Sequence, residues 1–462
     1  MEIRKERWPG DLPGYLAVAV ALALWRLFFP GLMSQDSIIQ YGQAVTGQYN
    51  DWQPPLMAIV LRAVLGLGGA LGLLMLAQCL AGVFGVRALA RESLELLCGD
   101  RVPPRRAAWL ALLVLLLLLL PWSPLAFYLM TFWKDAWAAV FLLWIGALAI
   151  ALFRRGAEPR RVALLVVLSA LLGLVRHNAV AILPLLGLVL WLGLRRAGVG
   201  RRAALALAAA PLALWLVANP LIDALFRVEK LHPDSQIMAL DLVGLCAAGR
   251  DLCAELPWTR SHVRDEAGLA RYRPGDIGLI FWDDPSPVDK TMRLDYPRLR
   301  AEYLHAVRRF PGELARVKLA AFETLLGIDQ TSYFFHGTIV ENPYGLRLAD
   351  RFAPARERLR GVVTGVAESG WRWLGGVHLV WIAVNVLWVA VLLALSFRSG
   401  DGRYRFLACL LLVPLGYYLS YLAATPTHDY RFMYPSTLMV QCVTISWLLS
   451  WLASRSWSRS SS

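Results

Sequence analysis

Charged side chains are scarce in this sequence: Asp, Glu, Lys and Arg make up 17% of its 462 residues, whereas 58% are hydrophobic. This composition is too apolar for a soluble protein of two or three domains. Long apolar runs alternate with Arg-rich breaks, and a helix needs about 20 apolar residues to cross a bilayer. The sequence therefore predicts an all-α polytopic membrane protein. Its net charge of +14 is then expected from basic cytoplasmic loops, and nucleic acid is not expected as a partner.

About ten transmembrane helices are predicted, with juxtamembrane helices in the first outward loop and a large outward loop before the last three spans. The predicted spans are residues 14–33, 70–90, 107–121, 134–153, 162–176, 179–194, 203–222, 377–397, 405–424 and 433–452. They divide the chain into an N-terminal transmembrane module (1–222), an extracytoplasmic region (223–376), and a C-terminal part with three spans and a cytoplasmic tail (377–462).

Lys and Arg are nearly missing from four of the short loops. The segments 34–54, 122–134, 176–178 and 425–432 contain only Lys134, Arg176 and Arg431, whereas six segments on the other side contain 21 basic residues. Basic residues mark cytoplasmic loops, so both termini are predicted in the cytoplasm and the four loops outside a bacterial cytoplasmic membrane. The N-terminal segment has the basic head of a signal peptide but no clear small-x-small cleavage site, and we interpret it as an uncleaved first span.

The first outward loop, residues 34–67, begins with SQDSIIQYGQAVTGQYNDWQPPL, which contains no Lys or Arg. Its apolar and polar residues are distributed as in an amphipathic helix with its polar edge away from the bilayer. Pro54 and Pro55 suit the start of a second helix, because N–H groups in a first helical turn have no partner anyway. Gly66 then begins a break before the next span. Two juxtamembrane helices, joined near the prolines, are therefore expected.

The sequence has no internal repeat of fixed period and no Cys/His spacing typical of a zinc finger. Four of the six cysteines lie in or beside spans and are expected to be packing residues. Cys246 and Cys253 fall in the outward region, where they either close a short disulfide, which is favoured, or remain two buried thiols. The sequence requires no cofactor, and a divalent metal is possible, for example at Asp51.

Polar and ionisable residues gather in the four outward loops. They are Asp36 and Asp51 in the first, Lys134 and Asp135 in the second, Arg176, His177 and Asn178 in the third, and His428, Asp429, Tyr430 and Arg431 in the fourth. Each cluster also has an ordinary explanation. Asp36 can be a solvated loop residue or cap, Lys134 and Asp135 a favourable helix start, Arg176 an ion-pair partner of Asp36 or Asp135, and 425–432 a polar turn.

The clusters share one face of the membrane and have complementary content, with carboxylates early in the chain and cations and imidazoles later. Ionisable groups this close to a membrane usually face a cavity or a partner. The combination suits a reaction at a lipid-linked phosphate. Cations would neutralise charge on a phosphate leaving group, and a carboxylate would take the proton of the attacking group.

With these residues assembled, the sequence resembles the polyprenyl-phosphate-sugar-dependent glycosyltransferases of the GT-C superfamily, especially the protein-mannosyltransferase and aminoarabinose-transferase-like branch. The matching features are SQDS after the first span, GQYNDWQPPL before a juxtamembrane helix, the outward hairpin between the fifth and sixth spans, and HDYRFMYP. The likeness covers the first six spans well and the rest loosely. The sequence departs in having Asp36-Ser37 where mannosyltransferases have Asp-Glu, and Gln53 where many relatives have His before Pro-Pro.

The resemblance implies transfer of a sugar from a polyprenyl-phosphate donor to a lipid, glycan or protein acceptor at the outer face of the membrane, with inversion at the anomeric carbon. Asp36 is then expected to be the general base or to orient the acceptor, and three cations to bind the donor phosphate: Lys134, Arg176 and Arg431. The expected secondary site residues are Asp51, Asp135, His177, Asn178, His428, Asp429 and Tyr430. Among these, Asp135 would orient Lys134 or bind the acceptor, and Asp51 would assist the base.

Two alternatives belong to other classes of protein. One is a transporter or flippase for a lipid-linked or anionic envelope precursor, and the other is a non-catalytic partner in an envelope complex. Transporters tend to carry their polar groups near the bilayer midplane on interrupted helices, often in repeated halves. Here the polar groups fall at the outer ends of spans, which favours the transferase.

Overall fold

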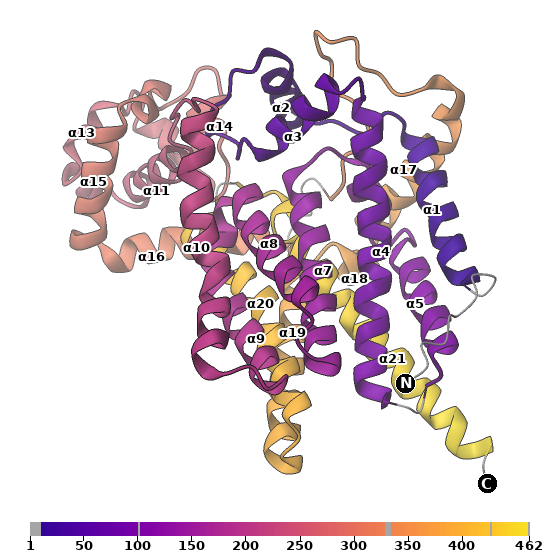
Figure 1. Cartoon of the computed structure of the whole chain (residues 1–462). Helices are drawn as coiled ribbons and strands as arrows, with labels where there is room; N and C mark the ends of the chain where they lie inside the picture. The colour runs from indigo at the N-terminus through magenta and orange to yellow at the C-terminus, as the bar shows by residue number, and fades with distance from the viewer. Residues whose placement is uncertain (1–10, 100–101, 329–333, 426, 461–462) are drawn as a thin grey trace.

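The structure, a computed structural model, describes residues 11–99, 102–328, 334–425 and 427–460 (Figure 1). In these residues the regular structure is helical, and β pairing is limited to four isolated bridges. The all-α polytopic fold predicted from the sequence is therefore confirmed. The predicted cytoplasmic ends, 1–13 and 453–462, lie partly outside the described residues.

Seven helical units among the described residues are long and apolar enough to cross a membrane. They are α4 (Leu71–Cys98), α7 (Lys134–Arg155), η3 with α9 (His177–Arg196), α10 (Arg201–Leu225), α19 (His378–Ser399), α20 (Gly402–Ala423) and α21 (Tyr434–Ser460). The other three predicted spans coincide with the shorter helices α1 (Leu12–Phe28), α5 (Pro104–Leu118) and α8 (Pro159–Val175). A short helix, α6 (Leu125–Met130), precedes α7.

Helix α7 lies in the centre of the bundle, and 72% of its membrane-crossing window is buried. Helix α7 packs closely against α4, where a glycine of α4 leaves room for a larger side chain of α7. A Cβ added at Gly85 of α4 would come within 3.2 Å of Leu143 of α7. A larger residue there would push the two helices apart, because protein interiors are close-packed. Helix α10 is at the periphery, packed on α8 and α9, and only 6% of its window is buried.

The basic helix ends gather at one end of the bundle. Arg154, at the end of α7, pairs with Glu92 (2.8 Å) and Glu95 (2.7 Å) near the end of α4. Arg403, at the start of α20, donates a hydrogen bond to the carbonyl of Leu96 (3.4 Å). In Figure 1 this end lies opposite to α2 (Gln35–Thr46) and α3 (Leu56–Gly66).

Helices α2 and α3 are the two juxtamembrane helices that the sequence predicts. Ser34 and Ser37 form a capping box that starts α2, and Gly47 ends it in the left-handed region with φ 74°. Arg62 of α3 donates hydrogen bonds to the carbonyls of Ala44 (3.0 Å) and Val45 (3.2 Å), which have no partner within the helix at its end. The two helices are thereby joined as one platform.

Much of the predicted outward region forms a helical unit with its own hydrophobic core, here called the α11–α16 unit. It contains α11 (Asp234–Ala248), α12 (Arg250–Ala254), α13 (Pro257–Ser261), η4 (Ala267–Arg271), α14 (Gly278–Phe281), η5 (Lys290–Leu294), α15 (Tyr296–Arg309) and α16 (Pro311–Leu325). Cys246 and Cys253 are joined by a disulfide within it. Afterwards η6 (Asp350–Phe352), α17 (Ala353–Glu368) and α18 (Arg372–Gly375) lead to the last three spans.

The α11–α16 unit is attached to the end of α20 and to the α20–α21 loop. Lys318 of α16 pairs with Asp241 of α11 (2.6 Å) and donates to the carbonyl of Ala423, the last residue of α20 (2.8 Å). The backbone N–H of His428 donates to the carbonyl of Gly275 (3.0 Å). These contacts place the unit over the helix ends that carry the predicted site.

Candidate functional site

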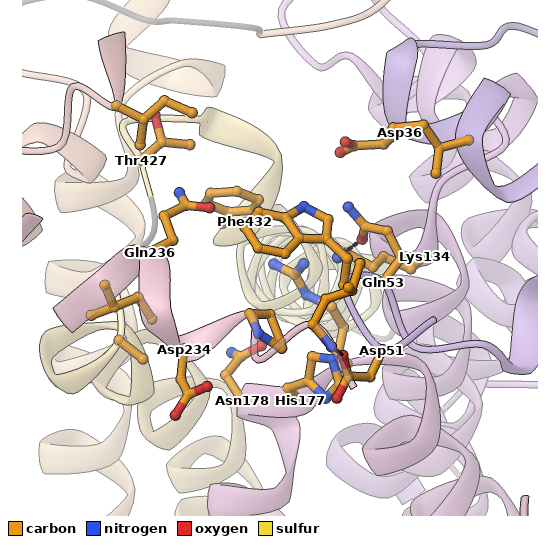
Figure 2. Close-up of a pocket in the computed structure, with 18 of the residues that line it drawn as sticks. Asp36, Asp51, Gln53, Lys134, His177, Asn178, Asp234, Gln236, Thr427 and Phe432 are labelled. Carbon is orange, nitrogen blue, oxygen red and sulfur yellow. Dashed lines mark hydrogen bonds between the residues drawn. The ribbon is translucent and has the colours of Figure 1, made fainter. Parts of the chain in front are cut away.

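A cavity of about 810 Å³ lies between the first juxtamembrane loop, the ends of several spans and the α11–α16 unit. Its acidic, basic and histidine lining residues are Asp36, Asp51, Lys134, Arg176, His177, Asp223, Lys230, Asp234, Arg293 and Arg431. Figure 2 shows Asp36 and Lys134 on one side and Asp234 and Gln236 on the other. The predicted base and the three predicted phosphate-binding cations therefore line a single cavity.

Asp36 is held by Arg431, whose guanidinium lies 2.7 Å from the Asp36 carboxylate. Arg431 also pairs through Nε with Asp429 (2.7 Å), and its guanidinium carbon lies 5.0 Å from the centre of the Trp133 indole ring. Asp429 is buried and outside the cavity lining, whereas the Asp36 side chain remains 29% exposed. Arg431 thus connects a buried carboxylate to one that faces the cavity.

The position of Asp36 follows from its place in the first turn of α2. The Ser37 hydroxyl donates to the carbonyl of Phe132 (2.8 Å), and the Trp133 indole N–H donates to the Ser34 hydroxyl (2.8 Å). These bonds join the start of α2 to the segment just before α7. They bring Asp36 and Lys134, which starts α7, to the same end of the bundle.

Arg176 forms an ion pair with Asp135 (2.9 Å), and the side chains are 6% and 0% exposed. Its guanidinium also donates to the Tyr421 hydroxyl and lies 4.9 Å from the centre of the Phe432 ring. Of the two carboxylates considered from the sequence, Arg176 therefore pairs with Asp135. Asp135 is not in the cavity lining, and its predicted role toward Lys134 or an acceptor stays a prediction.

Lys134 differs from the two arginines in having a neutral partner. Its ammonium group donates to the side-chain carbonyl of Gln53, and no carboxylate among the described residues forms an ion pair with it. Both residues line the cavity (Figure 2). The positive charge of Lys134 is thus the least compensated of the three cations.

The two carboxylates beside Arg431 differ in pKa. Burial by itself raises the pKa of Asp36, but the charges of Arg431 and Lys134 outweigh it and lower that pKa below its usual value. Burial raises the pKa of Asp429 to about 6, although Arg431 opposes the shift. Asp36 is therefore ionised throughout the neutral range, and Asp429 changes protonation just below it.

The remaining predicted residues have varied positions. Asp51 lines the cavity, but its carboxylate accepts a hydrogen bond from the backbone of Leu231 (2.6 Å) and lies 3.7 Å from Lys230. His177 and Asn178 also line it, and Asn178 donates to the hydroxyl of Ser420 (2.9 Å).

His428 and Tyr430 lie outside the lining. His428 contacts the carbonyl of Gly275 through Nδ1 (3.0 Å), and the buried Tyr430 hydroxyl donates to the carbonyl of Gly375. Both side chains are thus engaged in packing and backbone contacts of the helix connections. Neither side chain lines the cavity, and their role as secondary site residues stays a prediction.

Several lining residues were not singled out from the sequence. Lys230, Asp234, Gln236, Phe281, Trp282 and Arg293 come from the outward region, which has ordinary globular polarity and no motif at these positions. Trp133 was missed beside Lys134, although an aromatic residue next to a lone outward cation was a usable signal. No group of three or more His, Cys, Asp or Glu side chains suited to a metal ion occurs in the described part of the chain.

Comparisons with known proteins provide one similar fold. No protein-family model matches the sequence, and no curated protein matches it significantly. The structure is similar to that of ArnT from Cupriavidus metallidurans bound to undecaprenyl phosphate, with a TM-score of 0.34 and 16% sequence identity. The similarity covers 91% of this chain and 77% of that chain. At so low a score and identity, the chemistry of the cavity has to be derived from its own residues.

Proposed function

We propose that this protein is an integral membrane glycosyltransferase, which transfers a sugar from a polyprenyl-phosphate donor to an acceptor at the outer face of the bacterial cytoplasmic membrane. The observation that carries the proposal is the convergence of an ionised carboxylate, Asp36, and three cations on one cavity at the end of a membrane bundle. A polyprenyl chain lies in the bilayer while its phosphate lies at the boundary, and a cavity at the ends of apolar helices suits that arrangement.

The side of the membrane is inferred from the distribution of basic residues. The arginine pairs at the ends of α7 and α9 and at the starts of α8 and α10 are at the end of the bundle away from α2 and α3 (Figure 1). Basic connections of this kind face the cytoplasm, so the cavity would face outward. The donor would reach the cavity from the surrounding membrane lipids. The acceptor, which is a lipid, glycan or protein of the bacterial envelope, would reach it from the outer side.

The proposed step is a direct displacement at the anomeric carbon. A hydroxyl or amine of the acceptor forms the new bond to that carbon while the bond to the phosphate oxygen breaks, and polyprenyl phosphate leaves with the electron pair. Asp36 accepts the proton of the attacking group, as its ionised state permits. Attack opposite to the leaving group inverts the anomeric configuration.

The leaving phosphate gains negative charge as the bond breaks, and preorganised cations stabilise that charge. Lys134 suits this role best because its partner, Gln53, is neutral. Arg431 and Arg176 keep carboxylate partners on one side and still line the cavity. The carboxylates hold the arginines in place before the donor binds.

The test is an assay with purified full-length protein in lipid nanodiscs and a panel of polyprenyl-phosphate sugars, with and without EDTA to detect a need for divalent metal. Sugar release or transfer is expected with at least one donor. Asp36→Asn should reduce the rate about 10²–10⁴-fold, the range for loss of a general base. Asp251→Asn, at an exposed position of the α11–α16 unit, is the matched control and should retain activity.

Two results would contradict the proposal. One is the absence of release from every donor, and the other is undiminished release by Asp36→Asn. Movement of an intact lipid-linked sugar across the membrane, without its consumption, would instead support the transporter alternative.

A further inference from the structure

Arg293 is a cation of the cavity that the proposed chemistry does not use. Its Nε is buried without a hydrogen-bond partner, and its guanidinium carbon lies 4.5 Å from the centre of the Phe281 ring. No carboxylate among the described residues forms an ion pair with it, in contrast to Arg176 and Arg431. Burial lowers the pKa of Arg293, and an arginine remains charged nonetheless. A partly desolvated cation without a counterion is costly, which indicates a missing anionic partner.

The Phe281 ring beside Arg293 is one of three aromatic side chains that line the same cavity, here called the aromatic wall: Trp52, Phe281 and Trp282. The Trp52 and Phe281 rings meet edge to face at 5.8 Å, and the Phe281 and Trp282 rings are 5.5 Å apart. Trp282 is 71% exposed. So large an apolar side chain left in contact with solvent at a cavity offers a surface on which a ligand can pack.

The aromatic wall is continuous with the proposed donor site. Trp52 immediately precedes Gln53, whose side chain holds Lys134. A ligand on the wall would therefore lie next to a donor whose phosphate contacts Lys134. The wall itself belongs largely to α14 and its neighbours in the α11–α16 unit, which covers the cavity from the other side.

We propose that the aromatic wall and Arg293 form the acceptor site, and that the acceptor is a saccharide bearing a carboxylate or phosphate group. Aromatic faces suit the C–H faces of a sugar ring, and the guanidinium fork matches the two oxygens of a carboxylate or phosphate. A neutral peptide or a bare acyl chain would leave Arg293 without a counterion. The identification of this ligand as the acceptor rests on the proposed function, whereas the binding site does not.

The test measures binding, which requires no turnover. Saturation-transfer NMR on the full-length protein in nanodiscs would compare glucuronate and glucose 6-phosphate with glucose, in the wild type and in Arg293→Gln. At least one of the two acids should bind about tenfold more tightly than glucose to the wild type, and this preference should disappear in Arg293→Gln. Arg298→Gln, at a highly exposed position of α15, is the matched control and should keep the preference.

Two further variants make the result specific to this site. Phe281→Ala should weaken binding of the preferred acid through loss of the ring face, and Arg293→Lys should retain part of the preference because it keeps the charge. The proposal is overturned if neither acid binds more tightly than glucose, or if the preference survives in Arg293→Gln; loss of the preference in Lys134→Met in that case would show that the acid binds at the donor cations instead. Donor assays fail or succeed independently of this measurement, so the failure of either proposal is distinguishable from that of the other.

Discussion

Asp36 and Arg431 form an ion pair of 2.7 Å, although Asp36 lies just after the first helix of the bundle and Arg431 just before the last. The pair connects the first juxtamembrane helix to the α20–α21 loop at the cavity. The proposed base and one of the proposed phosphate-binding cations are thus in direct contact. Binding of a donor phosphate to Arg431 would draw on the same charge that lowers the pKa of Asp36.

Replacement of Lys134 by methionine should have the largest effect among the three cations. The substitution keeps an unbranched side chain in a half-buried position and removes the charge that lacks a carboxylate partner. Loss of one preorganised charge at a developing anion costs about 10²–10³-fold in rate, and we expect this reduction in kcat/KM for the donor. Lys290→Met, in η5 and outside the cavity lining, is the control. Equal rates in the wild type and Lys134→Met would remove Lys134 from the mechanism.

Gln53→Glu tests the same cation without deleting it. A carboxylate at this position would form an ion pair with Lys134 and compete with the donor phosphate for its charge. The donor KM should therefore rise at least about tenfold, a difference of 1.4 kcal/mol in binding. Gln53→Met removes the hydrogen bond and adds no charge, so it should affect KM much less. A rise of the same size in both variants would indicate a purely structural role for Gln53.

Replacing one residue of the buried Arg176–Asp135 pair should destabilise the protein more than replacing both. Asp135→Asn leaves Arg176 without its carboxylate, and loss of one partner of a buried pair destabilises a protein by about 3–5 kcal/mol. The double variant Asp135→Leu with Arg176→Met should recover much of that stability but little activity. Thermal unfolding in detergent and donor turnover would be measured in parallel. Full activity in the double variant would show that Arg176 acts only in the fold.

The raised pKa of Asp429 predicts that the affinity for the donor depends on pH. Its pKa of about 6 in the fold is above the ordinary carboxyl value of 3.8, because burial favours the neutral form. The contribution of Asp429 to the free energy of unfolding is fully present below pH 3.8, the ordinary pKa of the carboxyl group. It is lost as the pH rises through about 6, the pKa in the fold. Protonation also removes a negative charge 2.7 Å from Arg431, so the phosphodiester donor should bind more tightly at pH 5 than at pH 7.5. Isothermal titration across this range would check it, with Asp429→Asn as the variant in which the contribution of Asp429 is absent and the gain in affinity at low pH is smaller.

The disulfide should stabilise the α11–α16 unit without taking part in transfer. Cys246 and Cys253 are buried in the core of that unit and are absent from the cavity lining. In the chain-entropy account, a disulfide that closes so short a loop adds about 2 kcal/mol to the free energy of unfolding. The double variant Cys246→Ser with Cys253→Ser should therefore unfold at a lower temperature and retain kcat at lower temperatures. A selective loss of kcat in the folded variant would contradict this.

Sequence patterns located the spans and the polar clusters because both are local signals. Apolar runs must match the thickness of a bilayer, and Lys134, Arg176 and Arg431 stand out where basic residues are otherwise missing. The choice of partner was not local: Arg176 contacts Asp135 and Arg431 contacts Asp36 because of how the helix ends are rotated and packed. The placement of Phe281, Trp282 and Arg293 at the cavity depends on the tertiary structure of a region with ordinary polarity, and no periodicity or spacing marks these residues.

The hydrogen bond from His428 to Gly275 has a consequence for communication between the two ligands. Gly275 belongs to the unit that carries Phe281 and Arg293, and His428 is directly followed by Asp429, the partner of Arg431. A displacement of one segment can therefore reach the other through this hydrogen bond and through the one that Lys318 donates to the carbonyl of Ala423. Since coupling between two binding equilibria is reciprocal, we expect any change that the donor makes in the affinity for the acceptor to equal the change that the acceptor makes in the affinity for the donor.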